Sequence, residues 1–356
     1  MTDVLKSASH TATKSLNSIA NPASSCQVAF SLSDFERNQF FGGCNQTVIE
    51  NAEFQWLHLN HNGENSPAKH NHQLKALKPR VLVSGWRTPS LSEELMDSLE
   101  YVCHVTGSVR HVVPRSFIEK GHLVSNWGSL ISDTVAEHAL LLILSCLREV
   151  PRWHDTFAGP YTEKQQSIKT NTLFGRRVGI HGFGRVARHL VDLLKPFCAK
   201  ISAFSVGVPD DLFTSMEVRK SDSLETLFSQ NDIVVECEAL SPLTRHSITS
   251  EVLNLLPKDG VFVNVARGGL VDEDALVRLA SKGNLRVGLD VVEHEPLAVN
   301  SPLLQLPNVV VSPHIAGPTT DRFLTCGEFA LRNIAAFLNG EAVESLLTVD
   351  DYDRST

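Results

Sequence analysis

Residues 179–187 read Gly-Ile-His-Gly-Phe-Gly-Arg-Val-Ala. The stretch follows an expected strand at 177–181 and opens an expected helix at 186–196. It fits G-x-G-x-x-A, an allowed form of the dinucleotide-binding fingerprint. Gly182 permits the tight turn, and Gly184 lets the backbone approach a pyrophosphate at the helix N-terminus. We therefore expect cofactor contacts from Gly182, Phe183, Gly184, Arg185 and Val186.

The chain around and after this loop alternates between strands and helices. Expected strands lie at 177–181, 200–205, 233–237, 261–266, 286–291 and 308–312. Strands that alternate with helices form parallel sheets joined by crossover helices. Six strands in this order predict a doubly wound sheet and disfavour the alternative of an ordinary glycine turn.

The first half of the chain shows the same alternation. Expected strands lie at 27–30, 80–85, 101–106 and 122–125. Polar residues 60–72 are expected to form a loop, and residues 92–99 a helix with Ser92 as its N-cap. The predicted fold class is α/β, with two Rossmann-like, doubly wound parallel-sheet domains.

The composition narrows the class of protein. The 356 residues are 42% hydrophobic and 20% charged, which is typical of a globular chain. The net charge is −8 and no long basic run occurs, so we expect no nucleic-acid partner. The most apolar stretch, 139–144, is far shorter than the ~20 residues of a membrane helix, so no membrane partner is expected. The histidines are too scattered to predict a metal site.

The cysteines and the first residues bear on localisation. Seven Cys occur without a Cys-x-x-Cys pair, which favours a reducing, cytoplasmic compartment over a disulfide framework. Residues 1–25 hold nine Ser/Thr and no apolar core, so we expect a disordered tail. A transit peptide is the alternative, although Arg is absent from the segment.

The residue expected to contact the cofactor's ribose does not decide between NAD(H) and NADP(H). An acidic residue about 20 positions after the fingerprint usually binds the ribose 2′-hydroxyl. Ser205 stands at that place and can bind a hydroxyl without repelling a phosphate. The nearest later cations, Arg219 and Lys220, do not follow it directly. The cofactor is therefore expected to be NAD(H) or NADP(H), with the preference open.

Three polar residues follow three successive expected strands. Arg267 comes after 261–266, Glu295 after 286–291, and His314 after 308–312. The carboxyl ends of strands line the ligand crevice of an open parallel sheet. We therefore expect Arg267, Glu295 and His314 to meet at the nicotinamide end of the cofactor as the catalytic residues.

The chemistry of alcohol oxidation and ketone reduction requires such residues. Histidine titrates near neutrality and can move the hydroxyl proton, and a neighbouring carboxylate fixes its ring. Arginine binds a carboxylate as a two-pronged donor. Taken singly, these residues have structural alternatives. His314 could be a structural hydrogen-bonding residue, Arg267 could cap a turn, and the nearby carboxylates Asp290 and Glu293 could be solvated loop charges.

The motifs resemble those of the D-isomer-specific 2-hydroxyacid dehydrogenase family. They are Asn-x-x-Arg-Gly at 264–268, Asp-Val-x-x-x-Glu-Pro at 290–296 and Ser-Pro-His-Ile-x-Gly at 312–317. The resemblance implies that Arg267 binds the substrate carboxylate and that His314 is the acid/base with Glu295 as its partner. Asp290 is similar to the aspartate that contacts the nicotinamide carboxamide. The cofactor residues implied are Ser205, Ala239, Leu240, Thr244, Ala266, Arg267, Asp290, His314 and Gly317.

The family's substrate loop is altered here. Gly107 and Ser108 keep backbone amides that can hold a substrate carboxylate, but Arg110 and His111 replace the usual Asp-Asn. Arg87 stands where some relatives place an arginine near the substrate. The expected substrate residues are Arg87, Gly107, Ser108 and Arg267. Arg110, with Trp86 and Arg87, would shape a pocket for an anionic or larger substrate, and the alternative is that Arg110 is a structural ion-pair partner.

The resemblance also implies the domain organisation. Residues 133–318 would form an NAD(P)-binding domain inserted into a discontinuous substrate domain made of 26–132 and 319–356. The helix expected at 321–339 would carry the chain back to the first domain. A homodimer through the coenzyme domain is expected, with the apolar helix at 134–147 contributing to the interface.

The function expected from these features is hydride transfer between a nicotinamide cofactor and C2 of a 2-hydroxy or 2-keto acid, mainly as a reductase. One alternative is an NAD(H)-sensing binding protein on the same fold, as in the C-terminal-binding corepressors. Another is a related dehydrogenase with a different acceptor such as phosphite. Formate is disfavoured because formate dehydrogenases carry Gln at the position of Glu295.

Overall fold

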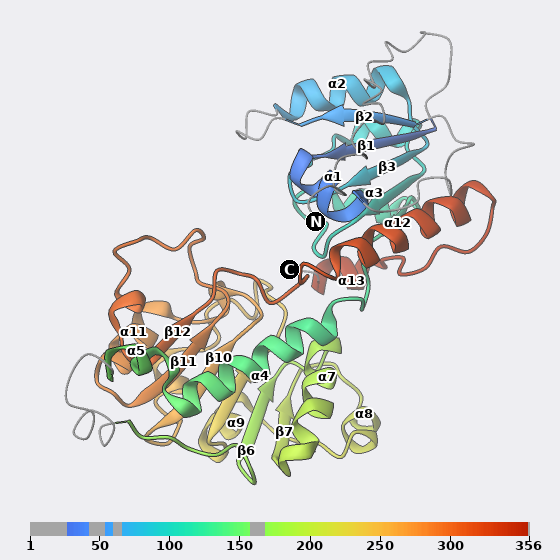
Figure 1. The fold of residues 1–356 in the computed structure, drawn as a ribbon. Coiled ribbons are helices and arrows are strands. Elements are labelled where there is room, and N and C mark those ends of the chain that lie inside the picture. Colours follow the sequence, from blue (N-terminus) through green and yellow to red (C-terminus); the bar gives the residue numbers. More distant parts are fainter. Residues whose placement is uncertain (1–26, 43–53, 60–65, 157–167, 355–356) are drawn as a thin grey trace, which may run out of the picture.

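The computed structural model describes residues 27–42, 54–59, 66–156 and 168–354. The expected tail at 1–25 lies outside these residues. The chain forms two α/β domains, each built on a fully parallel sheet, with five strands in the first and seven in the second (Figure 1). The predicted fold class is confirmed.

The second sheet has the strand order β12-β11-β10-β9-β6-β7-β8. The order reverses between β6 and β9, which places a topological switch point beside the carboxyl end of β6. All six predicted strands are present, and β8, a two-residue strand, was not predicted. The strands are β6 (Arg177–His181), β7 (Lys200–Phe204), β8 (Arg219–Lys220), β9 (Ile233–Glu236), β10 (Gly260–Asn264), β11 (Leu285–Leu289) and β12 (Val309–Val311).

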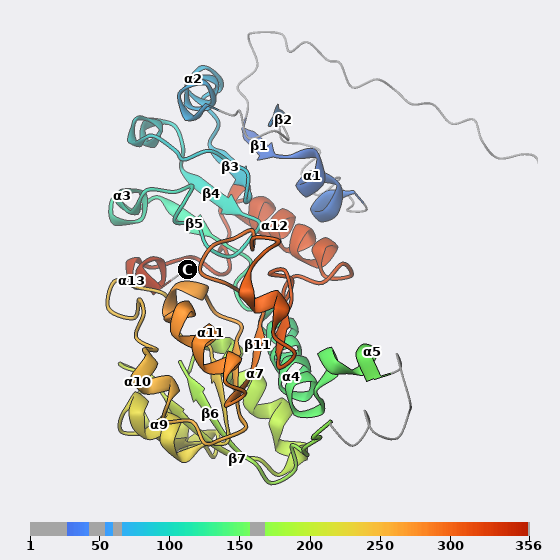
Figure 2. The ribbon, with the colours of Figure 1, turned by 90° about the vertical axis from the view of Figure 1, so that its left-hand side faces the viewer.

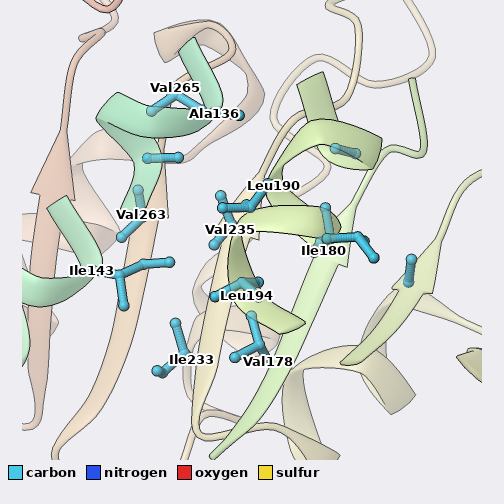
Figure 3. Packing of buried hydrophobic residues seen from close by; sticks show 14 of the residues in the cluster. Ala136, Ile143, Val178, Ile180, Leu190, Leu194, Ile233, Val235, Val263 and Val265 are labelled. Carbon is cyan, nitrogen blue, oxygen red and sulfur yellow. The ribbon is translucent and has the colours of Figure 1, made fainter. Parts of the chain in front are cut away.

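Helices cover both faces of this sheet. α4 (Ser132–Arg148) and α7 (Arg185–Leu194) pack against each other and, with α8 (Asp210–Ser215), cover one face. α9 (Leu224–Gln230), α10 (Ser250–Leu253) and α11 (Glu273–Ser281) cover the other. Figure 3 shows the first core, in which helix residues meet strand residues: Ala136, Ile143, Leu190 and Leu194 against Val178, Ile180, Ile233, Val235 and Val263. The glycine loop therefore joins two elements, β6 and α7, that are both packed into this core.

The first sheet has the order β2-β1-β3-β4-β5, the 2-1-3-4-5 pattern of a second doubly wound class. Its strands are β1 (Val28–Leu32), β2 (Phe54–His58), β3 (Val81–Ser84), β4 (Tyr101–His104) and β5 (Leu123–Ser125). Its helices are α1 (Asp34–Phe41), α2 (Pro67–Leu77) and α3 (Arg115–Glu119). The loop predicted at 60–72 is wrong from Pro67 onward, because α2 starts there with proline at its first position. Residues 60–65 of that prediction lie outside the described residues.

The end of the chain returns to the first domain. α12 (Phe323–Leu338) packs on α1 and β4, and its Cys326, Ala330 and Ile334 are buried in the first domain's core. α13 (Val349–Arg354) packs on α3, where the Tyr352 hydroxyl donates to the Val113 carbonyl at 2.8 Å. Figure 2 shows both helices beside the first sheet, so the second domain is inserted into the first. None of the described helices has the length and apolar character to cross a bilayer.

Candidate active site

The glycine loop has the geometry of a dinucleotide cradle. Gly182 has φ +84°, and a Cβ there would lie 2.6 Å from the Glu238 Cα, so only glycine fits. Its N–H donates to the Phe204 carbonyl at 2.8 Å. Phe183 stacks on Phe213 with ring centroids 4.5 Å apart, so its side chain packs in the core and a cofactor contact would come from its backbone.

Space remains where a pyrophosphate would bind. Gly184 is the N-cap of α7, which has no side-chain cap. Among the described residues other than its two chain neighbours, no heavy atom lies within 4 Å of the position of a Cβ on Gly184. The first N–H groups of a helix attract an anion. Arg185 is exposed in the first turn of α7 and Val186 is partly buried. The residues present fit a dinucleotide.

A buried acid–base pair lies beneath this loop. His181 ends β6 and its Nδ1 lies 2.7 Å from Oε2 of Glu236, which ends β9. Burial lowers the pKa of His181, the Glu236 carboxylate raises it, and the net result is a raised pKa. The other oxygen of Glu236 accepts the Glu238 N–H at 2.7 Å. The sequence analysis did not single out these residues.

Ser205 lies at the end of β7, where the ribose acid was expected. Its hydroxyl donates to Oε2 of Glu238 at 3.0 Å. Glu238 follows β9 and was not predicted, because no local sequence pattern relates it to Ser205. In that loop, Thr244 donates its hydroxyl to the Ala239 carbonyl at 2.6 Å and accepts the Ser241 N–H at 2.7 Å. Thr244 therefore fixes the shape of the loop.

Arg267 is held by its own motif. Asn264, at the end of β10, donates to the Arg267 carbonyl at 2.9 Å and accepts the Ala266 N–H at 3.0 Å. The Arg267 side chain is partly buried, and Nη1 donates to the Ala266 carbonyl at 2.6 Å. Burial lowers the pKa of Arg267, while the negative charges of Glu295 and Asp290 counteract that effect. The structure therefore brings Arg267 into the field of both carboxylates.

His314 and Glu295 form a hydrogen-bonded pair. The His314 Nδ1 lies 2.7 Å from Oε2 of Glu295, and 44% of the histidine side chain is exposed. Oε1 of Glu295 accepts the Val292 N–H at 3.3 Å. An ionised carboxylate only accepts, so it selects the tautomer with hydrogen on Nδ1 and leaves Nε2 for a ligand.

Asp290 organises the loop that carries His314. Its buried carboxylate accepts the N–H groups of Ile315 at 2.9 Å and Ala316 at 3.0 Å, and the Ser312 hydroxyl at 2.7 Å. Its carbonyl accepts the His314 N–H at 2.8 Å. His314 has φ +55°, a conformation that non-glycine residues keep only where surrounding contacts enforce it. Both carboxylate oxygens thus bond to the loop.

Two further residues support this loop. His138 of α4 places Nε2 2.8 Å from the Ser312 hydroxyl and 3.4 Å from the Asp290 carboxylate. A Cβ on Gly317 would lie 3.0 Å from side-chain atoms of Ile131 and Thr134, so the loop packs closely against the start of α4. His138 was not predicted, since a lone histidine in an apolar helix gives no distinguishing signal.

The altered substrate loop lies in the first domain. The Asn126 amide donates to the Gly107 carbonyl at 2.7 Å, and a Cβ on Gly107 would lie 3.0 Å from the Trp127 ring. Ser108 is partly buried in the same loop. Arg115 first, and Arg110 more weakly, hold the pKa of Asp353 below its usual value, so Arg110 is associated with the C-terminal helix. This electrostatic attraction to Asp353 favours the structural alternative for Arg110.

Arg87 borders a hollow of the first domain. Its N–H donates to Oε1 of Glu36 at 3.1 Å. The hollow, with a volume of about 390 Å³, is lined by Ser33, Phe35, Glu36, Trp86 and Arg87. The structure thus brings Arg267, Glu295 and His314 together in the second domain, while Arg87, Gly107 and Ser108 lie in the first.

Comparison with known proteins identifies the family. Residues 140–316 match the family model for the D-isomer specific 2-hydroxyacid dehydrogenase, NAD binding domain. A glyoxylate/hydroxypyruvate reductase of Arabidopsis thaliana is 32% identical over 77% of this chain and 85% of that protein. A D-3-phosphoglycerate dehydrogenase of Methanocaldococcus jannaschii is 31% identical over 77% of this chain, but the match spans only 52% of that longer protein.

A solved structure shares the fold. The NADPH-dependent glyoxylate/hydroxypyruvate reductase of Sinorhizobium meliloti superposes with a TM-score of 0.71 at 23% identity, over 93% of this chain and 100% of that one. The fold, the sequence motifs and the similar proteins all indicate the same family. The chain belongs to the D-isomer-specific 2-hydroxyacid dehydrogenase family.

Proposed function

We propose that the protein is an NAD(P)H-dependent reductase of 2-keto acids, with Arg267, Glu295 and His314 as its catalytic residues. The observation that carries the proposal is the 2.7 Å contact between His314 Nδ1 and Glu295, within the field of Arg267. These residues follow β10, β11 and β12 in the same sheet that carries the open glycine cradle. Ligands of doubly wound sheets bind outside these strand ends.

The proposed proton transfer uses Nε2 of His314. Glu295 accepts Nδ1–H and stabilises positive charge on the ring, so the protonated ring can donate from Nε2 to the substrate's C2 oxygen. In the oxidative direction the same nitrogen accepts the hydroxyl proton. A reduced nicotinamide cofactor, when bound, supplies the hydride that C2 receives.

Arg267 is the proposed carboxylate-binding residue. Its planar guanidinium can hold a carboxylate through two parallel hydrogen bonds, which also orients the keto group. The backbone amides at Gly107 and Ser108 would bind the same carboxylate from the first domain, with Arg87 nearby. The substrate would thus lie between the substrate domain, residues 26–132 and 319–356, and the coenzyme domain, residues 133–318. Closure of the two domains on the substrate would exclude water.

Two broader proposals concern assembly and location. We propose a homodimer through the coenzyme domain, since Leu141 on α4 and Trp153 at the start of α5 (Trp153–Thr156) are large, exposed apolar residues. We propose a cytoplasmic location, since every cysteine in the described ranges is a free thiol: Cys103, Cys146, Cys198, Cys237 and Cys326.

The test is the loss of absorbance of NADH and, separately, NADPH with a panel of 2-keto acids. The panel contains glyoxylate, hydroxypyruvate, pyruvate, 2-oxoglutarate, and branched and aromatic keto acids. Turnover that requires His314 is the expected result. Cofactor binding without turnover on any acid would contradict the reductase and favour the NAD(H)-sensing alternative.

A further inference from the structure

A carboxylate from another strand lies beside Ser205, the residue at the expected position of the ribose acid. Ser205 follows β7 and Glu238 follows β9, the two strands that flank β6 and its glycine loop. The Ser205 hydroxyl donates to Oε2 of Glu238 at 3.0 Å. The Glu238 backbone packs against Gly182, at 2.6 Å from where a Cβ would lie. The carboxylate is therefore next to the position that normally holds the ribose acid.

The Glu238 carboxylate is held in place through both oxygens. Oε1 accepts the Ala239 N–H at 2.9 Å, while the Glu238 N–H donates to Glu236 at 2.7 Å. Oε2 bonds to Ser205 and still has a lone pair, because a carboxylate oxygen can accept more than one hydrogen bond. The side chain is only partly buried, so a ligand hydroxyl can reach it.

Two of the neighbouring cations, Lys220 and Arg354, have carboxylate partners of their own. Lys220 pairs with Asp210 at 2.5 Å, and Arg354 pairs with Asp350 at 3.2 Å. An Arg354 nitrogen lies 3.9 Å from the position of a Cβ on Gly207. His181 bonds to Glu236 rather than to Glu238. Arg219 is exposed on β8, at the edge of the sheet.

We propose that Glu238, positioned by Ser205, binds the ribose hydroxyls of the cofactor and makes the site select NAD(H) over NADP(H). A carboxylate accepts hydrogen bonds from a ribose 2′-hydroxyl. A 2′-phosphate carries roughly two negative charges and would place them next to that carboxylate. The repulsion between like charges would disfavour binding of NADP(H). This assignment rests on the proposed function, since it specifies which cofactor the cradle takes.

The experiment measures binding, with no need for turnover. Isothermal titration calorimetry gives Kd for NADH and NADPH with the wild type, Glu238→Gln and Ser205→Ala. We expect the wild type to bind NADH at least about tenfold more tightly, and Glu238→Gln to lower this ratio by about tenfold because it removes the charge. Ser205→Ala should lower the ratio less, since Ser205 acts by positioning Glu238. Glu251→Gln, at an exposed site on α10, should leave the ratio unchanged.

A ligand series tests the same point without any variant. The wild type should bind 5′-AMP more tightly than adenosine 2′,5′-bisphosphate. Two results would overturn the role of Glu238 while leaving the proposed function intact. One is tighter binding of the bisphosphate and of NADPH by the wild type, and the other is an unchanged ratio of the two Kd values in a folded Glu238→Gln variant. Absence of binding by either dinucleotide would overturn the proposed function together with it.

Discussion

The Nδ1 atom of His314 lies 2.7 Å from Oε2 of Glu295, although the two residues are 19 positions apart in the chain. The contact forms because β11 and β12 are neighbours in the sheet and their carboxyl ends meet at one edge. His314 adopts φ +55°, and its N–H bonds to the Asp290 carbonyl at 2.8 Å. Backbone and ring are thus both fixed before substrate arrives.

Glu295→Gln should lower kcat by about 10- to 100-fold. The glutamine oxygen can still accept Nδ1–H, so the ring keeps its orientation but loses the negative charge that stabilises its protonated form. Steady-state kinetics with saturating NADH measures the effect. The control is Glu293→Gln, which alters another Glu–His pair of the same loop, Glu293 with His246 at 2.8 Å. Equal loss of kcat in both variants would contradict the assigned role.

Arg267→Lys should raise KM for the 2-keto acid by about 10- to 100-fold, because an ammonium cannot form the two parallel hydrogen bonds of a guanidinium. The change should leave Kd for NADH within about twofold, since the loss concerns the substrate carboxylate. Calorimetry and initial rates give the two values. A wild-type KM with a weakened Kd for NADH would show that Arg267 serves the cofactor instead.

Asp290→Asn should destabilise the loop that carries His314. One carboxylate oxygen becomes an amide NH2 facing an N–H donor, so a buried hydrogen bond of Ile315 or Ala316 is lost. We expect a loss of about 1–3 kcal/mol in the free energy of unfolding, together with a lower kcat. Urea unfolding measures the first quantity, with Asp274→Asn, exposed on α11, as the control. An unchanged unfolding curve and rate would refute the role of Asp290.

The pH dependence of stability should report on His104. This buried histidine bonds to the hydroxyls of Ser84 at 2.9 Å and Thr106 at 2.5 Å. Burial, assisted by the charge of His111, lowers its pKa from 6.5 to about 3. Between these values the unfolded chain binds a proton that the folded chain does not, so the contribution to stability is full above pH 6.5 and is lost as pH falls toward 3.

The variant His104→Gln isolates this effect. As pH falls below about 6.5, the wild type should lose up to about 1.4 kcal/mol per pH unit relative to His104→Gln. Urea unfolding between pH 7 and about 4.5 measures the difference. Parallel pH curves for the two proteins would show that His104 does not titrate in this way.

The sequence was enough to predict the parts that local pattern determines. The fingerprint at 179–187 predicted β6 and α7, and the motifs around Arg267, Glu295 and His314 predicted which residues meet at the strand ends. The contact between Ser205 and Glu238 joins residues 33 positions apart, and no local pattern relates them. Such pairs become apparent only when the order of strands in the sheet is known.

Long-range contacts also explain the local errors. The expected helix at 92–99 is a short 3₁₀ turn at Glu93–Asp97, and the Ser92 side chain does not cap it. Instead, Asn71 of α2 accepts the Ser92 N–H at 3.1 Å and donates to the Ser90 carbonyl at 3.0 Å. Asn71 was predicted to lie in a loop because the residues around it are polar. In the structure it lies on α2, and its side chain holds the turn at Ser90 and Ser92.

The most direct test of the account is the rate of NADH oxidation by His314→Gln with a 2-keto acid that the wild type reduces, measured with Kd for NADH in the same protein. The account predicts a fall in kcat of about 100-fold or more, since the proton donor is lost, while Kd for NADH stays within about twofold. A variant that keeps the wild-type kcat would contradict the central claim that His314 moves the proton.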